Sequence, residues 1–229
     1  MKMAITTRAD ENIKSMTDLT FPIIKNFCKK WNSDFIVLDQ NPIVLSDDNL
    51  PHFRIMKLYD LLNQYDRIIS LDSDIVINKN CPNLFKIVPE DCIGTIYEDQ
   101  GSRKKDRIKR MYDIQNQFGN INWNNGYINT GVFCVSKIHQ NIFTSINDKY
   151  YTKNGSDDVH IGYQIVKMKF KVKELNYKFN HMSMFSESWN GNPSRFDSFI
   201  IHYAGKGIFN LNMCDRLSQI KNDINIIYG

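Results

Sequence analysis

The fold is decided by residues 67–77, which read RIISLDSDIVI, an apolar run that leads into two carboxylates. Short, nearly continuous apolar runs are typical of strands that helices cover on both faces. Residues i and i+2 of an extended chain point the same way, so Asp72 and Asp74 can converge on one ligand. Open α/β sheets bind ligands beyond the carboxyl ends of their strands, and the acidic pair lies at such an end.

Apolar runs rich in β-branched residues alternate with helical patterns on both sides of this segment. The alternation favours βαβ units around a mostly parallel sheet. The strands are predicted at residues 2–8, 34–38, 67–71, 92–97, 127–135, 171–175 and 198–203. The helices are predicted at residues 22–31, 53–64, 103–117, 139–150, 159–168 and 213–225. Because no repeat or long linker divides the chain, we expect one domain over residues 1–229.

The composition indicates a globular protein and excludes several other classes. Of 229 residues, 42% are hydrophobic and 24% charged, which excludes disordered, collagen-like and disulfide-stapled chains. No apolar run approaches the roughly 18 residues of a membrane span, and the first ten residues turn polar too early for a signal peptide. We therefore expect a cytoplasmic protein with no transmembrane segment.

The net charge indicates which partners the chain can bind, and the cysteine spacing indicates the state of its thiols. The net charge is +4 and the pI about 8.7, below the range of a typical nucleic-acid binder, so no nucleic acid is expected as a partner. The five cysteines are widely spaced and form no C-x-x-C motif. Reduced thiols are therefore expected in place of a zinc site or a disulfide framework.

The acidic pair itself suggests a divalent cation. Two neighbouring carboxylates repel each other unless a cation offsets their charge. Mg²⁺ and Mn²⁺ prefer oxygen ligands and often bridge to substrate phosphates. A lone D-x-D more often caps a strand and starts a turn. The buried strand before Asp72 and Asp74 strengthens the case for a metal site until the two interpretations are about equal.

This strand and acidic pair resemble the D-x-D region of nucleotide-sugar glycosyltransferases with the GT-A fold, in the manner of glycogenin-like and related enzymes. Three further segments follow in the order of that family: HFRIMKL at 52–58, NTGVF at 129–133 and IIHYAGK at 200–206. The resemblance spans about residues 2–207. It implies an α/β, Rossmann-like GT-A domain with a central, mostly parallel mixed sheet flanked by helices. Residues 1–100 would form roughly the nucleotide-binding half, and 101–229 the sugar and acceptor half.

The resemblance also implies site residues. Asp72, Asp74 and His202 would bind Mn²⁺ or Mg²⁺. The donor would be bound by Thr6, Thr7, Arg8, Arg54, Lys57, Asp72, Ser73, Asn129, Thr130, Gly131, Gly205 and Lys206. A metal and basic side chains there would neutralise a departing diphosphate. The last motif departs from the family's H-x-x-G-x-K, because Lys206 follows Gly205 directly. Alternatively, His202 is a satisfied histidine at a strand end, and Arg54 and Lys57 form the exposed face of a helix.

A second acidic pair, Asp157 and Asp158, lies in the segment GSDDVHIG at 155–162. Acidic residues before an apolar periodic run mark a helix start. In the family this helix start faces the donor sugar, and glycogenin-like, configuration-retaining members carry Asp-Gln there. Several inverting families carry an acidic pair followed by Val or Thr and then Gly. The sequence therefore favours inversion, with Asp158 as the base that takes the acceptor proton and Asp157 bonded to the sugar.

The predicted function is metal-dependent transfer of a sugar from a nucleotide-diphosphate sugar, with a UDP-sugar expected, to a carbohydrate or other hydroxyl acceptor. One alternative is a haloacid-dehalogenase-like phosphatase with Asp72 as nucleophile and Asp74 as acid/base. That class normally begins with its nucleophile strand, whereas two strands precede this one. Another alternative is a non-catalytic nucleotide-sugar-binding domain.

Two further signals have competing interpretations. Residues 103–110, RKKDRIKR, form a dense basic run. Most such runs are solvated helix faces, and a functional one would bind an acidic acceptor, nucleic acid or a membrane surface. We expect a surface helix near the acceptor side. Trp123 and Trp189 could stack on a sugar ring, although large aromatic side chains are more often core residues.

Overall fold

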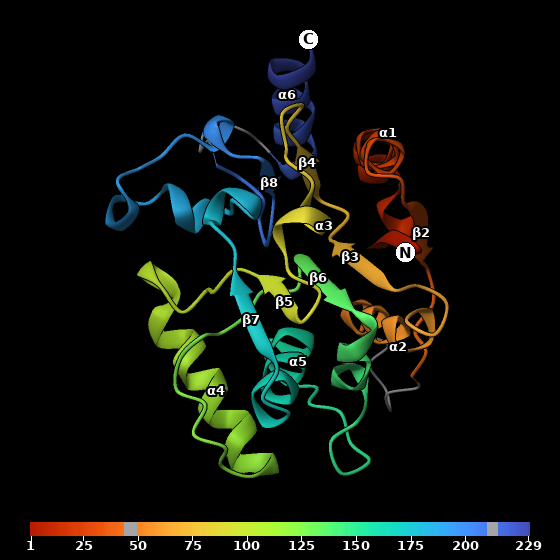
Figure 1. Ribbon diagram of the computed structural model, residues 1–229. Helices are drawn as coiled ribbons and strands as arrows, with labels where there is room; N and C mark the ends of the chain where they lie inside the picture. The colour runs from red at the N-terminus through yellow and green to blue at the C-terminus, as the bar shows by residue number, and fades with distance from the viewer. Residues whose placement is uncertain (44–49, 210–214) are drawn as a thin grey trace.

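The computed structural model describes residues 1–43, 50–209 and 215–229, and its centre is a six-stranded sheet (Figure 1). The strands lie in the order β2-β1-β3-β6-β5-β7. Their bounds are Met3–Arg8 for β1, Asp34–Leu38 for β2, Arg67–Leu71 for β3, Cys92–Thr95 for β5, Val132–Ser136 for β6 and Lys171–Glu174 for β7. All pairings are parallel except those of β6 with β3 and β5. The predicted mostly parallel mixed sheet is confirmed.

Helices cover both faces of this sheet. Their bounds are Lys14–Lys30 for α1, Leu58–Leu61 for α2, Leu84–Ile87 for α3, Lys104–Phe118 for α4, Ser156–Lys167 for α5 and Arg216–Tyr228 for α6. Short 3-10 turns fill many of the connections. No helix in the described ranges combines the length and apolarity needed to cross a membrane.

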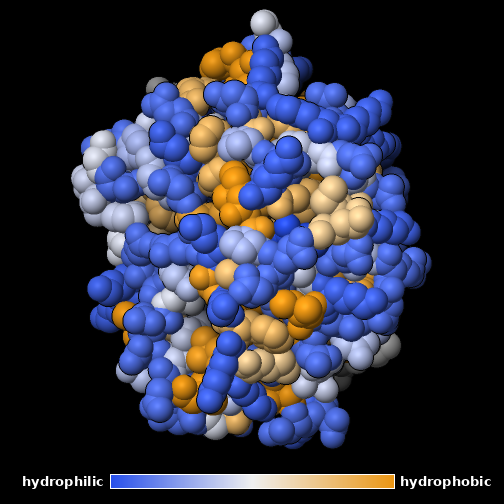
Figure 2. Space-filling model, in the orientation of Figure 1, coloured by the Kyte–Doolittle hydropathy of each residue, from blue (hydrophilic) through white to orange (hydrophobic). Residues whose placement is uncertain are grey.

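Alternation along the strands builds two core layers. Ile5, Ile69 and Leu71 pack on one face of the sheet in a cluster that includes Ile24 and Phe27 of α1. Ala4 and Ile68, one residue out of step, pack on the other face with residues of α2 and α5. Successive side chains of a strand point to opposite faces, so the apolar run of β3 supplies both layers. Hydrophilic residues cover most of the surface in view, and the hydrophobic groups between them are small (Figure 2).

Several element predictions were wrong in detail. Helix α1 begins eight residues before the predicted start at Pro22, which lies inside it. Proline favours a first helical turn, but Met16, Thr17 and Thr20 extend the buried stripe upstream and keep the chain helical past the proline. The predicted helix 53–64 is mostly 3-10, over Pro51–Lys57, before α2. The predicted helix 139–150 is a 3-10 segment, Lys137–Phe143. The predicted start of the last helix at Met213 lies outside the described residues.

A separate two-stranded ribbon was not predicted. Strand β4, Ile75–Ile77, pairs antiparallel with β8, Ile200–His202, and Ile75 lies opposite His202. The run of apolar residues after Asp74 therefore forms a strand of its own beside the main sheet. This pairing brings a residue near the end of the chain next to the central acidic pair.

Three strand ends meet at one edge of the main sheet. Strands β1 and β3 are parallel, so Arg8 and Asp72 leave the sheet at the same edge. Strand β6 is antiparallel to β3, with Val132 opposite Leu71, so the residues just before β6 reach that edge too. The topology thus collects Arg8, Asp72 and residues 129–131 at one place.

Candidate active site

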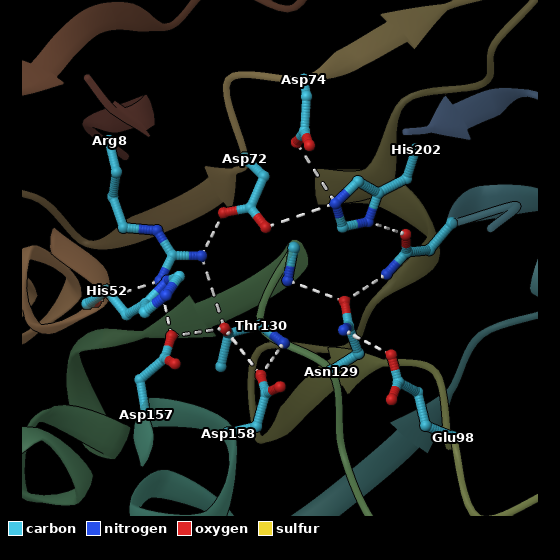
Figure 3. A network of polar contacts seen from close by, with 12 residues as sticks. Arg8, His52, Asp72, Asp74, Glu98, Asn129, Thr130, Asp157, Asp158 and His202 are labelled. Carbon is cyan, nitrogen blue, oxygen red and sulfur yellow. Dashed lines mark hydrogen bonds and ion pairs between the residues drawn. The ribbon is translucent and has the colours of Figure 1, made fainter. Parts of the chain in front are cut away.

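Asp72, Asp74 and His202 form the centre of the site (Figure 3). Their ligand atoms all lie within 4.8 Å of one another. Nε2 of His202 is 3.4 Å from Oδ2 of Asp72 and 3.3 Å from Oδ1 of Asp74. Two carboxylate oxygens and one imidazole nitrogen form a donor set that suits Mn²⁺ or Mg²⁺. The sequence predicted these three residues as one metal site, and the structure brings them together.

A chain of buried amides fixes the imidazole of His202. The Asn180 amide nitrogen donates to Oδ1 of Asn129 at 2.7 Å, so the oxygen of Asn180 faces His202. An oxygen can only accept, and Nδ1 of His202, 2.8 Å away, must therefore carry a proton. The Asn129 amide nitrogen donates in turn to Glu98 at 2.8 Å. The relay fixes the ring so that Nε2 points at the two aspartates, and once Nε2 has lost its proton its lone pair can bind a metal there, as in metal sites whose histidine is held through the other nitrogen.

The local charges favour ionised carboxylates. Burial lowers the pKa of His202, but the charges of Asp74 and Asp72 outweigh burial and raise the pKa to about 10. Burial raises the pKa of Asp72, but the opposing effect of Arg8 and His202 is larger. The pKa of Asp72 therefore lies well below its usual range. A divalent cation among these ligands would take over the charge that the imidazolium supplies here. The residues present therefore fit a divalent metal.

Arg8, the last residue of β1, joins the two acidic pairs. Its Nη2 contacts Oδ1 of Asp72, and its Nη1 is 2.5 Å from Oδ2 of Asp157. The same Nη1 donates to the carbonyl of His52 at 3.1 Å. Figure 3 shows the guanidinium between the aspartates. The sequence predicted Arg8 as a donor-binding residue from its position alone, and its ion pairs with both carboxylates were not anticipated.

Asp157 and Asp158 lie in the first turn of α5 and are hydrogen-bonded to Thr130. The Thr130 hydroxyl lies 2.9 Å from Oδ2 of Asp157 and 2.9 Å from Oδ1 of Asp158, and its backbone N–H donates to Asp158 at 2.8 Å. Burial, with the charges of Asp157 and Glu98, raises the pKa of Asp158 to about 8. Asp158 therefore keeps its proton to a higher pH than an ordinary carboxyl group does.

These residues line a cavity of about 490 Å³. A neighbouring cavity of about 310 Å³ lies against the same centre, because Arg8, Asp72, Asp74 and Arg216 line both. The metal-ligand group therefore stands at the junction of two cavities, which suits a ligand with two parts and a charged middle.

Close packing at Gly131 keeps the site compact. A Cβ at this position would lie 2.3 Å from Cε1 of His202 and 2.8 Å from Oδ1 of Asn129. The backbone of Gly131 also accepts the N–H of Asp72 at 2.9 Å. Only glycine allows the backbone just before β6 and the His202 side chain to approach each other this closely.

The other predicted site residues fall into two groups. Arg54 and Ser73 line the smaller cavity, and Gly205 lines the larger one. Arg54 is engaged with Asp10 at 2.6 Å. The structure does not bring the remaining predicted donor residues to either cavity: Thr6, Thr7, Lys57 and Lys206. The two threonines are buried within β1 because helices cover both faces of that strand.

The two lysines also lie apart from the site. Lys57 is 3.8 Å from Asp39, on the outer side of its 3-10 segment. Lys206 is exposed in the turn after β8, where the shortened H-x-x-G-K spacing places it. Arg216, at the start of α6, takes the position near the metal ligands: its Nη1 is 2.8 Å from Oδ2 of Asp74.

Sequence reasoning missed several polar residues of the site. Glu98, Asn180 and Arg216 belong to no motif and come from separate segments, so no local pattern marked them. For the basic run of α4 the sequence predicts only a surface helix near the acceptor side. Arg103, Arg107 and Arg110 of this run line the larger cavity.

The two tryptophans are not in this cavity. Trp123 is buried and stacks on Tyr127 with ring centroids 6.2 Å apart, so it is a core residue. Trp189 is 40% exposed and lines a separate cavity of about 340 Å³ with Tyr97 and Tyr177. Neither tryptophan lines the larger cavity beside Asp72, Asp74 and His202.

The fold and this site define a glycosyltransferase of the GT-A type, and comparison with known proteins agrees. The glycosyltransferase involved in the glycosylation of the major capsid of PBCV-1 superposes with a TM-score of 0.62 at 12% identity, covering 99% of this chain and 100% of that one. The galactosyltransferase LgtC, in complex with donor and acceptor sugar analogs, superposes with a TM-score of 0.57 at 14% identity, covering 100% and 97%.

A third solved structure is a mutant of Drosophila β1,4-galactosyltransferase 7 in complex with manganese, UDP-Gal and xylobiose. It superposes with a TM-score of 0.51 at 13% identity, covering 90% of this chain and 71% of that one. Identities this low show the fold alone. No curated protein sequence matches the chain.

The family is shown by sequence. The model of glycosyl transferase family 8 matches residues 3–207, and the chain belongs to that family. The predicted resemblance to GT-A nucleotide-sugar glycosyltransferases is confirmed. The phosphatase alternative loses its support, because the family that matches is one of glycosyl transferases.

Proposed function

We propose that this chain transfers a sugar from a nucleotide-diphosphate sugar to a hydroxyl acceptor in a reaction that depends on Mn²⁺ or Mg²⁺. The observation that carries the proposal is the Asp72–Asp74–His202 group at the junction of two cavities. The nucleotide would occupy the smaller cavity, and the sugar the larger one. The diphosphate would then lie between them, beside the metal ligands.

The chain's own residues would divide the work. When bound, the divalent ion supplies positive charge that stabilises the departing diphosphate. Arg216 and Arg8 border the same position and can add charge-assisted hydrogen bonds to phosphate oxygens. Asn129 and Asp157 face the larger cavity, where they can bind sugar hydroxyls. Leaving-group stabilisation of this kind is a large part of transfer catalysis.

Two related folds support the choice of donor. LgtC was solved with donor and acceptor sugar analogs, and the β1,4-galactosyltransferase 7 mutant with manganese and UDP-Gal. A UDP-sugar with manganese is accordingly our first choice for this chain. The acceptor is proposed to be a carbohydrate or another molecule with a free hydroxyl.

The stereochemical outcome depends on Asp158. The acidic pair favours inversion with Asp158 as base, and its raised pKa would make it a strong base once ionised. Family membership weighs toward retention, which is the course of glycogenin-like members with glutamine in this place. Proton NMR of the transferred anomeric centre separates the two: a configuration opposite to the donor supports Asp158 as base, and the same configuration contradicts that assignment.

A donor screen tests the proposed function. Hydrolysis of UDP-, GDP- and TDP-sugars is measured with and without Mn²⁺, beside a generic phosphomonoester. We expect metal-dependent release of one nucleoside diphosphate, with no phosphate released from the monoester. Asp74→Asn should abolish the release, whereas Asp91→Asn, an exposed aspartate paired with Lys171, should not. Binding without turnover on any donor would instead support the non-catalytic alternative.

We propose the cytoplasm as the location. Cys28, Cys81, Cys92 and Cys134 are free thiols, a state that a reducing compartment preserves. Fractionation of cells that express the tagged chain tests this: its recovery outside the cytosolic fraction would contradict the proposal.

A further inference from the structure

Three arginines of α4 and the turn before it face the larger cavity. Arg103, Arg107 and Arg110 are spaced by four and three residues, so they fall on one side of the helix. All three line the cavity. The lysines of the same run, Lys105 and Lys109, are exposed and lie on the opposite side of the helix.

Two carboxylates serve these three guanidinium groups. Nε and Nη2 of Arg107 each lie 2.5 Å from Oε2 of Glu98, in a buried ion pair. Asp106 binds Nη1 of Arg107 at 2.6 Å and Nε of Arg110 at 2.8 Å. Nη1 of Arg103 comes no closer than 3.7 Å to Glu98 in their ion pair. The stripe therefore presents an excess of positive charge to the cavity.

The excess charge is available to a ligand. The side chain of Arg103 is 28% exposed and that of Arg110 is 23% exposed, whereas Arg107 is buried at 9%. Guanidinium groups match phosphate, sulfate and carboxylate through paired hydrogen bonds. Arg107 is buried and paired with both Glu98 and Asp106. Arg110 is paired through Nε alone and Arg103 only at 3.7 Å, so these two have exposed nitrogens that can bind an anion.

The donor diphosphate does not need these arginines. Its proposed place is beside Asp74, and Glu98, the partner of Arg107, lies on the far side of the polar network from Asp74 (Figure 3). The arginine stripe instead borders the start of α5. Gly155 precedes Asp157 by two residues and Asp158 by three. A Cβ at Gly155 would lie 2.8 Å from Nη1 of Arg110. Arg110 thus lies against the residue that leads into the acidic pair, and the proposed function places the reacting end of the sugar beside that pair.

We propose that the acceptor is anionic: it carries a phosphate, sulfate or carboxylate group that Arg103 and Arg110 bind while its hydroxyl approaches the donor sugar. The proposal rests on the proposed function and adds the chemical class of the acceptor.

The test compares paired glycans on an array. The full chain, loaded with Mn²⁺ and UDP, is applied to neutral glycans and to the same glycans bearing phosphate, sulfate or uronate groups. We expect retention on anionic members at least tenfold above their neutral counterparts. Arg103→Gln with Arg110→Gln should remove this preference. The control, Lys105→Gln with Lys109→Gln, makes the same change in charge on the opposite side of the helix and should keep it.

The outcomes separate the proposals. The proposal of an anionic acceptor is wrong if the chain binds neutral and anionic glycans equally. It is also wrong if the double arginine variant keeps the preference for anionic glycans. A second experiment compares the hydrolysis of UDP-glucose and UDP-glucuronate by wild type and by the double arginine variant. If the variant loses only hydrolysis of UDP-glucuronate, the arginines bind an anionic donor sugar, and the proposal is wrong. Failure to hydrolyse any donor with Mn²⁺ contradicts the proposed function instead, because hydrolysis needs no acceptor.

Discussion

The guanidinium group of Arg8 forms an ion pair with one member of each acidic pair. Arg8 contacts Asp72 of the metal group and lies 2.5 Å from Asp157 of the helix start. Its burial would be costly without these partners, and the carboxylates would repel each other without it. A lysine has one point charge and cannot replace the forked contact. The carboxylates are therefore positioned before any substrate arrives.

At the same scale, Asn180 tests whether the hydrogen bond that orients His202 matters for metal binding. Asn180→Ala removes the acceptor of the His202 Nδ1 proton, so the imidazole loses its fixed orientation. We expect Mn²⁺ affinity to fall about 10- to 100-fold in calorimetric titration. The control Asn141→Ala, at an exposed asparagine, should keep the wild-type affinity. Unchanged affinity in Asn180→Ala would show that the relay does not orient the ligand.

Asp158 makes a prediction about pH. Its pKa of about 8 lies above the ordinary value near 4, so the folded chain binds more protons than the unfolded chain between these values. Its contribution to the free energy of unfolding is fully present below about pH 4 and is lost as pH rises through 8. Urea unfolding of wild type and Asp158→Asn should diverge by up to about 1.4 kcal/mol per pH unit in this window. Parallel pH profiles of the two proteins would contradict the raised pKa.

At the scale of elements, the β4–β8 ribbon does what the main sheet cannot. Strand β4 continues directly from the acidic pair and pairs with β8, so His202 is delivered beside Asp74 from a distant part of the chain. The relay residue Asn180 comes from the loop before β8, and His181 next to it bridges to Ile201. The metal group is therefore assembled by long-range pairing and depends on the folded chain.

Gly131 tests how tightly these elements must approach. Gly131→Ala places a methyl group 2.3 Å from Cε1 of His202, and neither the strand entry nor the buried imidazole can move freely. We expect a loss of about 1–3 kcal/mol in unfolding free energy and a loss of Mn²⁺-dependent donor hydrolysis.

The matched control is Gly191→Ala, where no atom lies within 4 Å of the added methyl group and only backbone strain is introduced. This variant should keep the wild-type metal dependence of donor hydrolysis. Full metal dependence in Gly131→Ala would show that the histidine and the strand entry need not be this close.

At the scale of the molecule, the sequence predicted the sheet better than the site. Strands β2 and β3 have the predicted bounds because their apolar runs are bounded by polar residues. The metal group was predictable because a D-x-D pair follows a buried strand and the histidine lies in a recognisable segment. Arg216 was not predicted, because its contact with Asp74 joins residues 142 positions apart. Thr6 and Thr7, predicted to bind the donor from their place at the end of the first strand, line neither cavity, because position alone does not show which side chains the helices cover.

The account depends on a divalent cation held at the junction of the two cavities. The most direct measurement is the anomalous scattering of manganese in crystals grown with Mn²⁺ and UDP. We predict one strong peak bound by Asp72, Asp74 and His202 and in contact with the diphosphate of UDP. UDP bound with no manganese among these three side chains, or manganese held elsewhere, would contradict the central claim.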